Sequence, residues 1–349
     1  MKRIAIICVI LCTPLLINAQ TQIPTLDDLD HEIAMSSQYD KQYEDVIRSV
    51  KKQLYAAKSM EARYDLSNKL FNLYTSYSVD SAIVYAMEKQ KIAKAMGNQS
   101  KVNDAKLNLA YLLIRGGELK DASDIINSIP RSGINQDLSF YYFSTRKTLY
   151  RTLADAALIP SQRKMYKQME KLCNDSVVDN NQSPDIWSRA EQLVNRQQYE
   201  QAKKILLDAY HHLKPGDRQT AFVSISLADI YGREKNVEAQ KQYLIAAAIS
   251  DIRNSVKEYL ALQQLAMILF EEGDTKRAYA YMDHAMNDAV FCNARQRTIA
   301  MADVWPAIEK SHERETKSRT LKLTAALVLI SLLSVFLLVM IIYTRRRVV

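Results

Sequence analysis

The sequence predicts an all-α protein, in which a helical-repeat superhelix is followed by a single transmembrane helix. Three observations lead to this fold class. A pattern of small and large residues returns with a period near 39 residues. Glycine and proline are scarce, at 7 each in 349 residues, while helix-favouring Ala, Leu, Lys, Gln and Glu are frequent. One long stretch near the C-terminus carries no charged residue.

Residues 1–19 have the features of a secretory signal peptide. Lys2 and Arg3 precede a short apolar run, and Ala19 offers a small residue at the cleavage point. We therefore expect the mature chain to begin at Gln20 and to leave the cytoplasm.

Residues 20–60 are predicted to form an N-terminal capping helix segment over the first repeat. Leu26, Leu29, Ile33 and Met35 suggest its buried side. Repeat arrays need such caps because a terminal repeat would otherwise expose its apolar face to water.

The repeats themselves are expected over residues 61–305 as six helix pairs. Two copies align well: "LAYLLIRGGELKDASDIINSI" from Leu109 and "LAMILFEEGDTKRAYAYMDHA" from Leu265. Together with three weaker copies, they place equivalent residues at 82, 122, 202, 240 and 278, and the double step between 122 and 202 predicts a degenerate unit around Pro160. Alanine at all of these positions except Gln240 lets neighbouring helices approach closely, and Gly117 and Gly273 suit the turn that ends each first helix.

The repeat marks resemble the tetratricopeptide repeat (TPR): Leu-Ala, an aromatic residue or Leu four residues on, Gly-acidic, then Ala, Tyr or Leu, and Ala. The whole chain also resembles a family of Bacteroidota inner-membrane proteins with a signal peptide, periplasmic tetratricopeptide-like repeats and one transmembrane helix. Stretches that carry this resemblance include "NKLFNLYTSYSVDSAIVYA" and "FCNARQRTIAMADVWPAIE". It implies a regulatory role, exerted in that family through a cytoplasmic coiled coil and a C-terminal domain of unknown function. This chain departs from that pattern because it stops at Val349.

The predicted membrane segment covers residues 323–344, which is long enough to cross a hydrocarbon core of roughly 30 Å as a helix. A charged helical stalk, 306–322, precedes it, and a short tail, 345–349, follows with three arginines. The positive-inside rule then places the tail in the cytoplasm and the repeats in the periplasm, for a single-pass protein of the inner (cytoplasmic) membrane.

Charge argues against nucleic-acid binding. Lys2, Arg3 and the tail arginines carry +5 and residues 310–322 carry +3 of the formal net charge of +8, so residues 20–309 are neutral. Two cysteines remain after signal removal, Cys173 and Cys292. We expect separate, partly buried thiols, since a disulfide would need the two residues to meet within about 7 Å.

The candidate binding residues lie on the predicted concave face. Residues at i, i+3 and i+7 of each first helix share one stripe, which could hold an extended peptide. This stripe gives the candidates Asn108, Tyr111, Arg115, Glu191, Asn195, Asp229, Arg233, Gln264, Met267 and Glu271. A solvated helix face without a ligand fits the same pattern.

Taken together, these patterns predict a membrane-anchored, extracytoplasmic scaffold that binds a protein or peptide, such as the sensing half of a signalling protein. An envelope chaperone or assembly factor is the alternative. We expect no enzyme activity, metal or cofactor, because no zinc-binding, phosphate-binding or nucleophile motif is present in the sequence. The membrane helix binds the bilayer and also offers a way for two copies to pair.

Overall fold

The computed structural model describes residues 24–179, 186–214 and 216–348, and the predicted signal peptide lies outside them. Helices joined by short connections account for the described residues, and no strand occurs among them. The all-α class predicted from the sequence is therefore confirmed.

After a long first helix, α1 (Leu26–Ala56), the described helices follow one another as packed pairs. The pairs are α2 (Met60–Tyr74) with α3 (Val79–Ala95), α4 (Gln99–Gly116) with α5 (Leu119–Asn127), α6 (Gln136–Ala156) with α7 (Pro160–Asp179), α8 (Ile186–Asn195) with α9 (Tyr199–His212), α10 (Arg218–Arg233) with α11 (Val237–Arg253), and α12 (Ala261–Glu271) with α13 (Thr275–Cys292). A single 3₁₀ turn, Arg131–Gly133, leads into α6, and α14 (Arg295–Ala302) and α15 (Trp305–Val348) complete the chain.

Small residues mark the contact between the helices of a pair. Ala82, Ala122, Ala202 and Ala278 are each 0% exposed and lie near the start of the second helix. A larger side chain there would push the two helices apart, because protein interiors are close-packed. This packing explains why these positions show the repeat in the sequence.

The turn that ends the first helix of a pair often needs a left-handed backbone. Gly117 and Gly273 have φ of 85° and 88°. At the equivalent positions of two other pairs, Gln197 and Lys235 adopt φ of 60° without being glycine. The turn geometry is thus kept where the glycine signal is absent, which is why those two units are harder to recognise.

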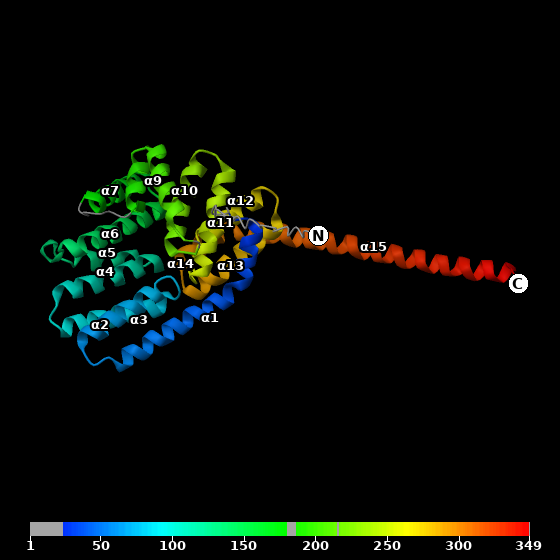
Figure 1. Cartoon of the computed structure of the whole chain (residues 1–349). Coiled ribbons are helices and arrows are strands. Elements are labelled where there is room, and N and C mark those ends of the chain that lie inside the picture. Colours follow the sequence, from blue (N-terminus) through cyan, green and yellow to red (C-terminus); the bar gives the residue numbers. More distant parts are fainter. Residues whose placement is uncertain (1–23, 180–185, 215, 349) are drawn as a thin grey trace, which may run out of the picture.

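The array curves until its first and last parts meet. In Figure 1, α1 runs beside α11 and α13, and Leu29 of α1 and Val79 of α3 lie in one hydrophobic cluster with Leu244 and Met282 of the C-terminal pairs. We call this contact between residues 26–118 and residues 218–302 the seam. The predicted cap therefore covers the last pairs as well as the first.

The last helix projects away from the body in Figure 1. Its first turns belong to the body, since Ile308 is 0% exposed. The same helix then continues unbroken through the apolar stretch, which makes no buried contact with the rest of the described chain. By length and composition it could cross a membrane.

Candidate functional site

The α4 part of the predicted stripe faces other helices. Asn108 is 3% exposed, donates from Nδ2 to the hydroxyl of Tyr141 at 3.0 Å and accepts a hydrogen bond from Lys89. Two turns further on, the guanidinium of Arg115 lies 5.5 Å from the ring centre of Tyr111. These side chains stand together as predicted, but Asn108 is already used within the protein.

Arg115 is the most constrained of the candidate residues. It forms an ion pair with Glu258 and donates to the backbone carbonyl of Thr75, and only 10% of its side chain is exposed. Burial disfavours its charged form, but the Glu258 carboxylate more than offsets this, and the pKa of Arg115 is raised. Its charge is therefore neutralised by another part of the same chain.

Glu191 on α8 also has intramolecular partners. Its carboxylate accepts from Lys147 Nζ at 2.6 Å and from Arg151, and Arg151 in turn pairs with Glu170 at 2.6 Å. Burial would raise the pKa of Glu191, yet the two cations prevail and lower it. One turn later, Asn195 is exposed.

The α10 and α12 candidates are more open. Asp229 and Arg233 form an ion pair of 2.9 Å along one helix, and more than half of each side chain is exposed. Glu271 is exposed, whereas Met267 packs against the C-terminal core and Gln264 is half-buried. Asn195, Asp229, Arg233 and Glu271 thus remain accessible to a ligand, and binding by the stripe stays a prediction.

Sequence reasoning missed a buried charged cluster at the seam. Lys257, in the connection between α11 and α12, is 3% exposed and donates to Asp40 of α1 at 2.6 Å and Asp288 of α13 at 3.1 Å. Its backbone N–H donates to the carbonyl of Ser76 at 2.7 Å. Repeat periodicity holds no signal for the contacts with Asp40 and Ser76, because they join parts of the chain that are far apart in the sequence.

A second ionisable group at the seam has an unusual proton affinity. Desolvation, and to a lesser extent the negative charge of Glu258, raise the pKa of Asp251 to about 7, although Arg218 and Arg297 oppose the shift. Asp251 still has some exposed surface. Burial therefore opposes the ionisation of this carboxyl even though it is not fully enclosed.

Comparison with known protein families identifies the family of this chain. The family model for the SusR N-terminal TPR domain matches residues 33–303. The chain belongs to the SusR N-terminal TPR domain family. No curated protein matches it.

The match to the SusR-type TPR domain begins inside α1 and ends just before α15. It therefore includes the described helix pairs, while the start of α1, with the seam residues Asp27, Asp30 and Glu32, lies before it. The tetratricopeptide-like superhelix predicted from the repeat marks is confirmed. The apolar part of α15 lies outside the match.

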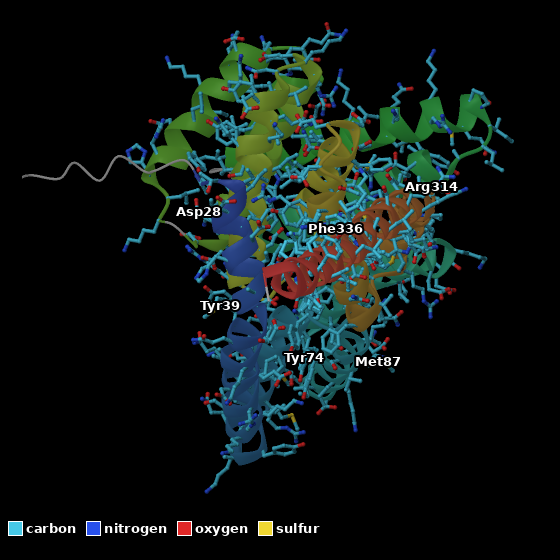
Figure 2. All side chains as sticks on the ribbon, turned by 90° about the vertical axis from the view of Figure 1, so that its right-hand side faces the viewer. Asp28, Tyr39, Tyr74, Met87, Arg314 and Phe336 are labelled. Carbon is cyan, nitrogen blue, oxygen red and sulfur yellow. The ribbon has the colours of Figure 1, made fainter. Side chains whose placement is uncertain are left out.

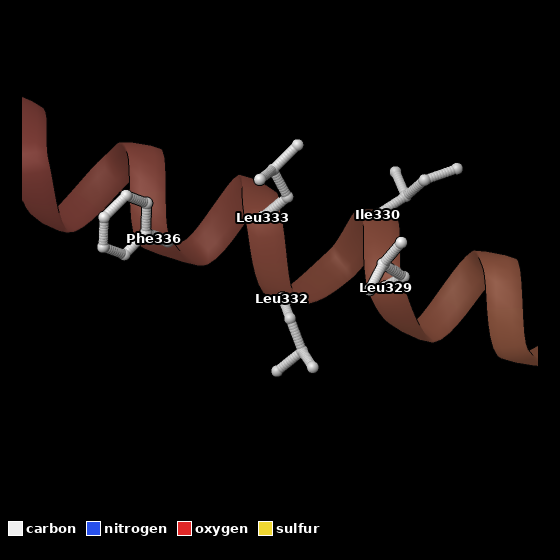
Figure 3. A pocket seen from close by; sticks show the side chains of 5 residues that line it. All are labelled: Leu329, Ile330, Leu332, Leu333 and Phe336. Carbon is white, nitrogen blue, oxygen red and sulfur yellow. The ribbon is translucent and has the colours of Figure 1, made fainter.

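Within the described part of the SusR-type chain, no group of three or more His, Cys, Asp and Glu residues could hold a metal ion. Cys173 and Cys292 are free and buried. A hollow among Leu329, Ile330, Leu332, Leu333 and Phe336 lies on α15 alone, and Figure 3 shows these side chains radiating from a single helix. Such a surface suits lipid chains better than a specific ligand.

Proposed function

We propose that the chain is a membrane-anchored, extracytoplasmic scaffold that binds a protein or peptide and serves as the sensing half of a regulatory protein. The observation that carries this proposal is the continuity between a SusR-type TPR body and an apolar, fully exposed helix. A repeat body offers an extended curved surface to a partner, and an apolar helix of this length fits a bilayer.

The proposed location is the inner membrane, with the repeats in the periplasm. The signal-peptide pattern of residues 1–19 and the arginines after residue 344 both favour this orientation. The neutral charge of residues 20–309 gives no reason to expect a nucleic-acid partner. We also propose that the membrane helix could bring two copies together.

The proposed binding surface is the accessible part of the predicted stripe. Asn195, Arg233 and Glu271 stand near the ends of the first helices of three successive pairs and are exposed. Their amide, cationic and anionic groups could fix the backbone and charged side chains of an extended partner. Binding rather than catalysis is proposed, since the charged groups of the α4 and α8 stripe are already ion-paired with other residues of the chain, Arg115 with Glu258 and Glu191 with Lys147.

The proposal can be tested by photo-crosslinking in native membranes. A photoreactive amino acid is placed at Asn195, Arg233 or Glu271 in turn, and the matched control position is Lys204, which is exposed on the second helix of a pair. We expect discrete adducts from the three stripe positions and none from Lys204. Equal adducts from all four positions would contradict a ligand site on the stripe.

The same experiment separates the scaffold from the alternative, an envelope chaperone. A scaffold gives one adduct of defined mass whose yield saturates as the partner increases. A chaperone gives many adducts that multiply when envelope proteins are unfolded, because it recognises unfolded chains as a class.

A further inference from the structure

Helix α13 holds the N-terminal helix on one side. Arg277 Nε donates to Asp30 of α1 at 3.0 Å, and Arg277 also pairs with Asp27. The hydroxyl of Tyr281, one turn along α13, donates to Asp30 at 2.7 Å. Because these residues are about 250 positions apart, the contacts join the first helix of the array to its last helix pair.

On its other side, α13 holds the membrane helix. The ring of Tyr279 lies between two aromatic rings of α15, with centroid distances of 5.3 Å to Trp305 and 4.1 Å to His312. Ile308, between them in sequence, is 0% exposed. The first turns of α15 are thus packed on the body and do not form a loose tether.

The spacing along α13 explains how one short stretch serves both contacts. Arg277 and Tyr281 are each two residues from Tyr279, and two residues correspond to about 200° of rotation around an α-helix. The seam contacts and the α15 contacts therefore emerge from opposite faces of the same two turns. Figure 2, which looks toward the body from the α15 end, shows α1 with Asp28 and Tyr39 on one side and Arg314 of α15 on the other.

The charges on the two sides of the seam are complementary. Nearly all its ion pairs have the carboxylate on the N-terminal side and the cation on the C-terminal side: Asp27 and Asp30 with Arg277, Glu32 with Arg253, Asp40 with Lys257, and Glu118 with Arg295. Several of these pairs are partly exposed, so each alone contributes little. These pairs add to the buried contacts of Leu29 and Lys257, so reversing one charge weakens the seam without unfolding the helices on either side.

We propose that α13 couples closure of the seam to the position of α15, so that opening the seam between α1 and α13 loosens or reorients the membrane helix. The coupling passes through α13 itself, because it is a rigid element that contacts both partners. This inference goes beyond the proposed binding function and does not depend on which ligand the body takes.

The test uses the full chain in lipid nanodiscs, with Trp187→Phe so that Trp305 is the single remaining tryptophan. The seam is broken by Arg277→Glu. The matched control is Arg48→Glu, which makes the same charge change in an exposed pair on α1 away from α13. Amide exchange of residues 26–33 reports on the seam, and acrylamide quenching of Trp305 reports on α15.

We expect Arg277→Glu to speed exchange of residues 26–33 about tenfold, the change that corresponds to 1.4 kcal/mol. Trp305 should become more accessible to acrylamide at the same time. Adding Asp27→Lys and Asp30→Lys to Arg277→Glu should restore both signals, and Arg48→Glu should alter neither. Faster exchange with unchanged Trp305, or no change in either signal, would overturn the proposal.

A second variant changes the contact between α13 and the membrane helix and measures the effect on the seam. Coupling between two sites is reciprocal, so His312→Ala, which removes one stacked ring from Tyr279, should also speed exchange of residues 26–33. An effect confined to Trp305 and its neighbours would show that α13 is a passive support. Neither measurement needs a ligand, so failure here leaves the binding proposal to its own crosslinking test.

Discussion

Lys89 shows how a single buried residue can organise two helix pairs. Its side chain is 0% exposed, and its ammonium donates to Asn68 at 2.6 Å, to Asp104 at 2.8 Å and to Asn108. Burial lowers the pKa of Lys89, with Asp104 acting in the opposite direction. Removing the cation would leave three polar groups without their partner.

We expect Lys89→Ala to lower the free energy of unfolding by about 3 kcal/mol, the lower end for a broken buried pair, because Asp104 stays partly exposed. Urea denaturation of the full chain in detergent, followed by circular dichroism, measures the change. Lys120→Ala, which removes an exposed i,i+4 pair with Asp124, is the control and should leave the midpoint unchanged. Similar midpoints for the two variants would contradict the structural role of Lys89.

The raised pKa of Asp251 predicts that the stability of the protein depends on pH. Its pKa is raised from 3.8 to about 7 by burial, so between these values the folded chain binds more protons than the unfolded chain. The contribution of this group to the free energy of unfolding therefore falls as pH rises, by roughly 1.4 kcal/mol per pH unit within this window.

Asp251→Asn removes the ionisable group and should flatten this part of the stability–pH profile. We expect the variant to be more stable than the parent protein from pH 5 upward, with a difference that grows until about pH 7. Thermal unfolding from pH 5 to 8 measures the difference, with exposed Asp208→Asn as the control. Parallel profiles for the parent and Asp251→Asn would show that the carboxyl is ionised throughout.

At the scale of the element, the end of α4 offers a matched pair of glycines. Gly117 has φ of 85°, and an added Cβ would meet the Gln296 side chain at 3.0 Å, whereas a Cβ on helical Gly116 would meet nothing within 4 Å. We expect Gly117→Ala to destabilise the protein by about 1 kcal/mol and Gly116→Ala to stabilise it slightly. Equal shifts in the thermal midpoint would argue against the left-handed turn.

The helices of the repeats were largely predictable, because their signals are local. The degenerate unit around Pro160 is a helix pair, with Pro160 as the first residue of α7, where its missing N–H costs no hydrogen bond. The stripe was less predictable. Helical spacing places Asn108 and Arg115 on one face. It does not reveal that Asn108 already accepts a hydrogen bond from Lys89 and that Arg115 is already ion-paired with Glu258.

At the scale of the whole molecule, orientation across the membrane can be tested by labelling. Ala34 is exposed on α1, and the native Cys173 and Cys292 are buried, so Ala34→Cys introduces an accessible thiol. With the repeats in the periplasm, a membrane-impermeant maleimide should label this variant in intact spheroplasts. The unsubstituted chain is the control, and labelling only after lysis would place the repeats in the cytoplasm.

The seam is the feature of the whole molecule that most affects the proposed function. It packs the connection around Lys257 against α1, and Glu258 of the same connection pairs with Arg115 of the predicted stripe. The accessible stripe is therefore confined to Asn195, Asp229, Arg233 and Glu271. A partner would pair with Arg115 only if its ion pair with Glu258 opened.

The sequence by itself determined the helical class, the period and the apolar segment that is long enough to cross a membrane. Each depends on residues a few positions apart, whose spacing and hydrophobicity decide local structure. Only the tertiary structure decided the contacts of Arg277, Lys257 and Glu258, because closure depends on small rotations between pairs that accumulate along the array. The sequence of a single repeat does not specify the total rotation along the array, so the seam could be found only from the tertiary structure.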